Sequence, residues 1–168
     1  MAGKFFDLLQ KYHGLGERER LLLRLAAILH DCGKFISMSA PGECAYQIIM
    51  STEILGISHM EREMVASIVR YNTMELPNFN EFDGKLGNDE YLIVMKLAAI
   101  LRVCNALDRS HRQKFADMKL TIKDSNIVIT TPYPDNITLE KKTLKDKQDF
   151  FEEVYGLGFE IKQKKKKQ

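Results

Sequence analysis

The chain has 168 residues, of which 45% are hydrophobic and 29% charged, a balance that is ordinary for a globular domain and excludes extensive disorder. Its net charge is +2, but removing the five lysines at 162 and 164–167 leaves −3 for the rest. We therefore expect no binding of duplex nucleic acid, and no apolar run is long enough to cross a membrane.

The N-terminal residues lack the pattern of a secretory signal. The cysteine content also argues against secretion. Cys32, Cys44 and Cys104 are odd in number and include no CxxC pair. This usage is typical of reduced thiols rather than of a disulfide framework. We therefore expect a cytoplasmic location.

Hydrophobic periodicity predicts helices through most of the first two thirds of the chain. An opening helix ends near residues 13–16, where two glycines stop it. The predicted helices that follow are 17–29, 43–55, 58–71 (with a capping box from Ser58 to Glu61) and 91–107. Between the last two, residues 72–89 read as a long polar loop.

The periodicity changes after residue 115. Residues 118–122 and 127–130 flank a turn and predict a β-hairpin, residues 139–155 predict a helix, and residues 159–161 predict a closing strand. The predicted fold is mainly α: a helical bundle (1–114) with a small ββαβ appendage (115–163) and a disordered basic tail (164–168).

Two long apolar helices end in acidic residues, and this pattern predicts a shared polar site. His30 and Asp31 follow the first helix, and Asp108 follows the helix 91–107. Consecutive helical residues point about 100° apart, but Gly33 suggests that the helix unwinds there, which would let His30 and Asp31 converge. Imidazole and carboxylate suit a divalent ion such as Zn, Mn, Fe or Mg, and bundles build metal centres from facing helices.

Several basic residues lie near predicted helix ends and could hold a phosphate. They are Lys34, Arg70, Arg102, Arg109 and Arg112. The alternative is that each arginine pairs with a neighbouring acid, for example Arg109 with Asp108.

The string His30-Asp31-Cys32-Gly33-Lys34 after an apolar helix resembles the motif of the HD superfamily of metal-dependent phosphohydrolases. A narrower resemblance covers essentially the whole chain, and its most telling segments are 61–63 with 69–71 and 107–111. In order, residues 13–20, 26–34, 51–71 and 97–111 resemble the C-terminal HD-like domain of the exopolyphosphatase and guanosine pentaphosphate phosphohydrolase family.

That resemblance implies a setting for the domain. In this family a separate pair of actin-like, Mg-using domains removes terminal phosphate from polyphosphate or guanosine pentaphosphate. The helical part helps to bind the substrate and to form a homodimer. The resemblance thus implies polyphosphate or guanosine phosphates as ligands, and actin-like phosphatase domains as partners in cis or in trans.

The sequence departs from a full HD site, which leaves the metal in question. The opening helix has no histidine in its run from Phe5 to Tyr12, and the histidine-rich stretch of relatives reads here as residues 38–44. Glu43 could replace one of those histidines as a ligand, and Asn72 stands where relatives often have another. The predicted ligand set is therefore His30, Asp31, Glu43 and Asp108, or no metal at all.

Three functions remain open at this stage. The first is a binding and assembly domain with a degenerate metal site and no catalysis of its own. The second is an active HD phosphohydrolase acting on a nucleotide or phosphoester, in which a basic residue stabilises the developing charge. The third is a purely structural helical module.

Overall fold

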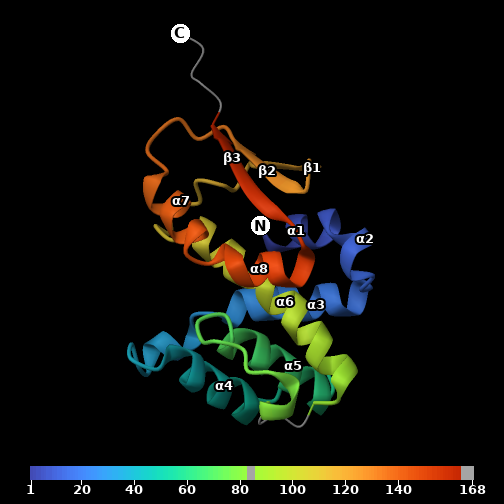
Figure 1. Cartoon of the computed structure of the whole chain (residues 1–168). Coiled ribbons are helices and arrows are strands. Elements are labelled where there is room, and N and C mark those ends of the chain that lie inside the picture. The colour runs from blue at the N-terminus through green and yellow to red at the C-terminus, as the bar shows by residue number, and fades with distance from the viewer. Residues whose placement is uncertain (83–85, 164–168) are drawn as a thin grey trace. The chain divides into compact units, whose positions relative to one another are not determined.

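The computed structural model describes residues 1–82 and 86–163, in which helices predominate beside one small sheet (Figure 1). This confirms the predicted fold class. The chain forms two compact units: residues 15–101, called here the helical unit, and residues 1–14 with 102–168, called the sheet unit. The predicted domain boundaries at 114 and 163 stay a prediction, and the predicted tail at 164–168 lies outside the described residues.

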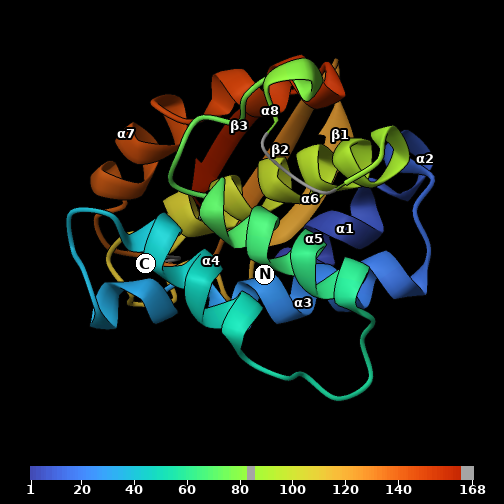
Figure 2. The ribbon, with the colours of Figure 1, turned by 90° about the horizontal axis from the view of Figure 1, so that it is seen from below.

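The helical unit is built around α5, which packs against both α3 and α4; Figure 2 shows these helices side by side. All residues of α5 from Glu63 to Val69 are buried, including the polar Glu63 and Ser67. The elements of this unit are α3 (Glu17–Leu29), the 3-10 turn η1 (Cys32–Phe35), α4 (Pro41–Ser51), α5 (His59–Arg70), the 3-10 turn η2 (Phe79–Glu81) and the first part of α6 (Asn88–Leu107).

The start of α5 is held by the predicted capping box, which the structure confirms. The Glu61 backbone N–H donates to Ser58 Oγ at 3.2 Å, and the Ser58 N–H donates to Glu61 Oε2 at 2.7 Å. Arg18 on α3 also pairs with Glu61. The Arg18 and Ser58 contacts lower the pKa of Glu61 to about 2. The cap thus also ties α5 to α3.

Two glycines allow the short elements around α4 to pack backbone against backbone. A Cβ on Gly33 would lie 1.9 Å from Pro41 O, and one on Gly42 would lie 2.7 Å from Arg70 O. Neither backbone oxygen is free to move, so only glycine fits at these positions. They set η1 against the start of α4, and the start of α4 against the end of α5.

The structure corrects the predicted bounds of α4. The helix begins at Pro41, a favoured residue for a first helical position, and ends at Ser51 rather than Leu55. Thr52 is already extended, and Leu55 is 91% exposed. The apolar residues Ile54 and Leu55 thus lie outside the helix, so apolar character alone does not extend it.

The sheet unit combines the first helices of the chain with its C-terminal third. β1 and β2 form the predicted hairpin, whose turn residues Asp124 and Ser125 both have positive φ. β3 pairs with β2 in parallel, so the sheet order is β1-β2-β3. The elements are α1 (Ala2–Leu8), α2 (Gln10–His13), β1 (Lys119–Lys123), β2 (Asn126–Thr131), α7 (Thr138–Lys145), α8 (Gln148–Tyr155) and β3 (Gly158–Gln163).

The single helix predicted over 139–155 is wrong, because two helices, α7 and α8, occupy that stretch with a break at Asp146 and Lys147. The Lys147 N–H bonds to Leu144 O, three residues back, which tightens the turn before α8 begins. No proline or glycine marks the break, so the sequence carries no breaker signal there.

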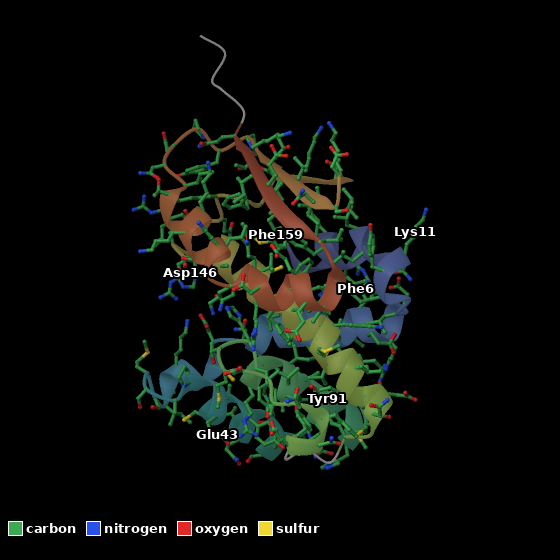
Figure 3. The ribbon with its side chains drawn as sticks, in the orientation of Figure 1. Phe6, Lys11, Glu43, Tyr91, Asp146 and Phe159 are labelled. Atoms are coloured by element: carbon green, nitrogen blue, oxygen red, sulfur yellow. The ribbon has the colours of Figure 1, made fainter. Side chains whose placement is uncertain are left out.

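The N-terminal helix belongs to the core of the sheet unit. α1 packs on β1, and α8 packs on β3. Lys4 Nζ donates to Ala116 O at 2.9 Å, and the fully buried Phe5 meets the ring of Phe159 edge-on at 6.4 Å; Figure 3 labels Phe159 on β3. Within the described residues, the helices are all too short or too polar to cross a bilayer.

Candidate functional site

The residues predicted to form a site come from both units, and those of the helical unit begin at the turn after α3. α3 ends at Leu29, and His30 and Asp31 carry the chain into η1. The helix tightens there, so the two consecutive side chains turn toward each other, with His30 Nε2 3.4 Å from Asp31 Oδ1. The convergence inferred from Gly33 is therefore present.

The His30 ring is oriented by its own helix. Its Nδ1 lies 2.9 Å from the carbonyl oxygen of Ala27, to which a protonated Nδ1 donates. Its Nε2 faces the Asp31 carboxylate at 3.4 Å. A backbone carbonyl behind one nitrogen is how metal-binding histidines are commonly held.

A lysine already neutralises the carboxylate next to this histidine. Lys34 Nζ lies 2.6 Å from Asp31 Oδ1, the same oxygen that faces His30. Among residues 1–82 and 86–163, no three His, Cys, Asp or Glu side chains gather closely enough to hold a metal ion. The predicted ligand set of His30, Asp31, Glu43 and Asp108 stays a prediction.

Glu43 and Arg70 form an ion pair of the helical unit. Glu43 lies in the first turn of α4, as Figure 3 shows, and Arg70 is the last residue of α5. Arg70 Nε is 2.8 Å from Glu43 Oε2, although the direction of its N–H does not make this a hydrogen bond. Arg70 thus pairs with an acid, which was the alternative to its holding a phosphate.

Two residues that the sequence did not single out support Arg70. Its guanidinium lies 5.2 Å from the ring centroid of Tyr46, and the Tyr46 hydroxyl donates to Glu63 at 2.5 Å. Burial, followed by this bond to Glu63, raises the pKa of Tyr46. The signal available in the sequence was a glutamate beside the apolar run of α5; in the structure Glu63 is only 2% exposed. The network fixes the end of α5.

The predicted site residues of the sheet unit include Asp108, which closes a turn at the end of α6. Its Oδ1 accepts the backbone N–H of Gln113 at 3.0 Å, and its backbone oxygen accepts from His111 at 2.8 Å. His111 and Gln113 both have positive φ, so the turn is tight. Within the described residues Asp108 forms no ion pair with Arg109.

Three cations of the sheet unit lie near enough for their charges to interact. Burial lowers the pKa of Lys147, and the nearby charges of Arg102 and then Arg109 lower it further. Arg102 lies over the ring of Phe150, with its guanidinium carbon 4.2 Å from the ring centroid. Arg102 and Arg109 were predicted from the sequence, whereas Lys147 was missed because it sits where one continuous helix was expected. We call Arg102, Arg109 and Lys147 the cation cluster.

A buried ion pair anchors the loop that carries the last predicted residue, Arg112. Glu140 on α7 is fully buried and accepts from the Ser110 hydroxyl at 2.5 Å and from Lys114 Nζ at 3.0 Å. Burial alone would raise the pKa of Glu140, but these two donors more than offset it, and the pKa is lowered. Arg112 itself is exposed and lines an open pocket.

The two units differ in chemistry. Asp31 and Glu43 of the helical unit are paired with cations, whereas in the sheet unit the charges of Arg102 and Arg109 act on Lys147. Arginine and lysine side chains suit an anion such as phosphate.

A comparison with known protein families identifies the family of the chain. Residues 1–148 match domain III of the Ppx/GppA phosphatase family, and the chain therefore belongs to that family. This confirms the resemblance drawn from the sequence segments. A search of curated proteins found no match.

Proposed function

We propose that the chain is a polyphosphate-binding or guanosine phosphate-binding domain of a Ppx/GppA-type phosphatase, with a degenerate metal site and no catalysis of its own. The family match over residues 1–148 carries this proposal, and the charges of Arg102, Arg109 and Lys147 support it. Burial lowers the pKa of Lys147 most, and the charges of Arg102 and Arg109 lower it further. A bound polyanion would offset these like charges, and groups with perturbed electrostatics are concentrated at functional sites.

The pairing of the acidic groups supports the degenerate metal site. A divalent ion would need the Asp31 oxygen that Lys34 holds at 2.6 Å and the Glu43 oxygen that Arg70 holds at 2.8 Å. Each acid already has a cation supplied by the protein. A metal would have to displace both, and the charges of the displaced lysine and arginine would then oppose it.

The test is the binding of polyphosphate of defined chain length to the full chain, by fluorescence anisotropy at several salt concentrations. The double variant Arg109→Gln/Lys147→Gln should weaken binding by about tenfold or more and make the salt dependence shallower, because two charged contacts are lost. The matched control is Lys141→Gln/Lys142→Gln, which removes two exposed charges from α7 in the same unit.

The control pair separates a specific site from general attraction to lysine. Equal weakening by the two double variants would show that polyphosphate binding depends only on the net charge of the chain. That result would overturn the proposal. A folded chain that binds neither polyphosphate nor guanosine tetraphosphate would favour the purely structural module instead.

An active metal-dependent HD phosphohydrolase is the second candidate, and the geometry of His30 favours it. In the tautomer that carries its proton on Nδ1, the ring is held by Ala27 O, and Nε2 is left to bind a metal ion beside Asp31. The discriminating measurement is the metal content of the purified chain together with a phosphatase screen in Mn²⁺ or Mg²⁺. Stoichiometric metal, with turnover lost in Asp31→Ala, would replace the first proposal by this one.

The family supplies the remaining parts of the proposal. We propose that the domain works with actin-like phosphatase domains, in cis or in trans, as a homodimer in the cytoplasm. Light scattering of the purified chain tests the dimer. Co-purification with a separately expressed catalytic pair from the same family tests the partnership.

A further inference from the structure

The sheet unit has a pocket whose lining contains no residue of the cation cluster. Its volume is about 520 Å³, within the range of small-molecule sites. It lies between the turn after α6 and the connection from β2 to α7. Its lining residues are Arg112, Lys114, Tyr133, Asp135, Asn136, Thr138 and Leu139.

The walls of this pocket are fixed by hydrogen bonds. Lys114 Nζ donates to Asn136 O at 2.8 Å as well as to the buried Glu140. From the end of β3, the Gln163 side chain donates to the backbone oxygens of Tyr133 and Asp135, at 2.9 and 2.5 Å. The β2–α7 connection is therefore held from both sides, and a ligand would meet a formed pocket.

The lining offers a cation for phosphate. Arg112 is exposed and makes no hydrogen bond or ion pair with another of the described residues, so its five donors are open to a ligand. Asn136 uses its Oδ1 to accept the Thr138 N–H at 2.7 Å, which leaves its amide N–H groups as donors. Arginine and amide donors together suit a phosphate group.

The rest of the lining does not suit a bare polyanion. The carboxylate of Asp135 would repel polyphosphate, yet it can accept from hydroxyl or amino groups. The ring of Tyr133 and the half-exposed Leu139 offer apolar surface to a flat group. Lys114 Nζ lies 5.9 Å from the Tyr133 ring centroid and helps to hold that ring in place. The pocket thus combines a phosphate donor set with a face for a planar ring.

We propose that this pocket binds a nucleoside mono- or diphosphate, with the base against Tyr133 and Leu139 and the phosphate on Arg112. Asp135 and Asn136 then face the sugar and the edge of the base. This site is separate from the cation cluster and does not depend on polyphosphate binding there.

The experiment is calorimetric titration of the full chain with AMP, GMP, CMP and UMP, and with inorganic phosphate and tripolyphosphate as probes that lack a base. We expect nucleotides to bind and the base-free probes to bind at least about fivefold more weakly, since base–aromatic stacking contributes about 1–3 kcal/mol. Arg112→Gln should weaken nucleotide binding by about tenfold or more, and Tyr133→Leu by about fivefold.

Two controls keep the result interpretable. Thermal unfolding of each variant shows whether it is folded, and shifts of backbone NMR signals on titration locate the ligand. Arg109→Gln/Lys147→Gln should lose polyphosphate while keeping its affinity for AMP, CMP and UMP, so failure of one site is distinguishable from failure of the other. No nucleotide binding, equal affinity for tripolyphosphate, or NMR shifts away from residues 112 and 133–139 would each overturn the proposal.

Discussion

The turn after α3 and the turn after α6 were predicted as two halves of one site, yet they treat charge in opposite ways. In the helical unit Asp31 and Glu43 each have a cation within 2.8 Å, and the resulting pairs stabilise the fold. In the sheet unit burial lowers the pKa of Lys147, and the charges of Arg102 and Arg109 lower it further. An acid paired with a cation stabilises the fold, whereas a positive charge placed near like charges is of the kind found at functional sites.

The largest effect should come from the ion pair that anchors the sheet unit. Glu140→Gln leaves the Lys114 ammonium, only 10% exposed, without its counter-charge, and we expect a loss of about 3–5 kcal/mol in the free energy of unfolding. Urea unfolding followed by circular dichroism measures it. The exposed Glu153→Gln is the control, expected within about 0.5 kcal/mol of the parent chain.

The same carboxylate sets a pH dependence. Because the folded pKa of Glu140 is lowered from 4.5, its stabilisation is complete above pH 4.5 and is lost as the pH falls through the folded pKa. In Glu140→Gln that part of the acid-induced loss should disappear. Parallel stability–pH curves for parent and variant below pH 4.5 would contradict the pairing.

A smaller effect is expected where the helical unit packs most tightly. Gly33→Ala would place a Cβ 1.9 Å from Pro41 O, so η1 must move off α4, at a cost of about 1–3 kcal/mol. Thermal unfolding measures it, and Gln47→Ala on the exposed side of α4 is the control. An unchanged melting temperature would mean that η1 does not pack on α4 as described.

Removing a charge from the cation cluster should raise the free energy of unfolding rather than lower it. Because the folded pKa of Lys147 is lowered from 10.5, its charge destabilises the fold at neutral pH, and this cost fades as the pH rises toward 10.5. Lys147→Met should therefore stabilise the chain by up to about 1 kcal/mol while weakening polyphosphate binding. A variant that loses stability at pH 7 would remove the contrast between the two units.

The smallest stability change is expected for Lys34, the lysine of the helical unit that we compare with Lys147. Lys34 and Asp31 are about one third exposed, so Lys34→Met should cost less than about 1 kcal/mol. It also frees the carboxylate beside His30, and binding of Mn²⁺, followed by electron paramagnetic resonance, should become tighter than in the parent chain. Lys34→Arg, which keeps the charge, should not change it; tighter binding there too would show that Lys34 is not what blocks the ion.

Local signals in the sequence were sufficient for several elements. The bounds of α3, the capping box at Ser58 and the hairpin around Asp124 and Ser125 rest on residues within a few positions of one another, and all are present as predicted. The end of α4 and the break at Lys147 were not predictable, because neither carries a glycine or proline. Tertiary packing determines both the end of α4 and the break at Lys147.

The sequence by itself determined the family, the mainly helical class and the turn that brings His30 to Asp31, because each follows from residue order and local backbone preference. Only the tertiary structure decided that Arg70 pairs with Glu43, and that Lys147 joins Arg102 and Arg109. The physical reason is that the charge environment of a side chain depends on neighbours distant in sequence. Residue type states what a group can bind, and packing decides which partner it meets.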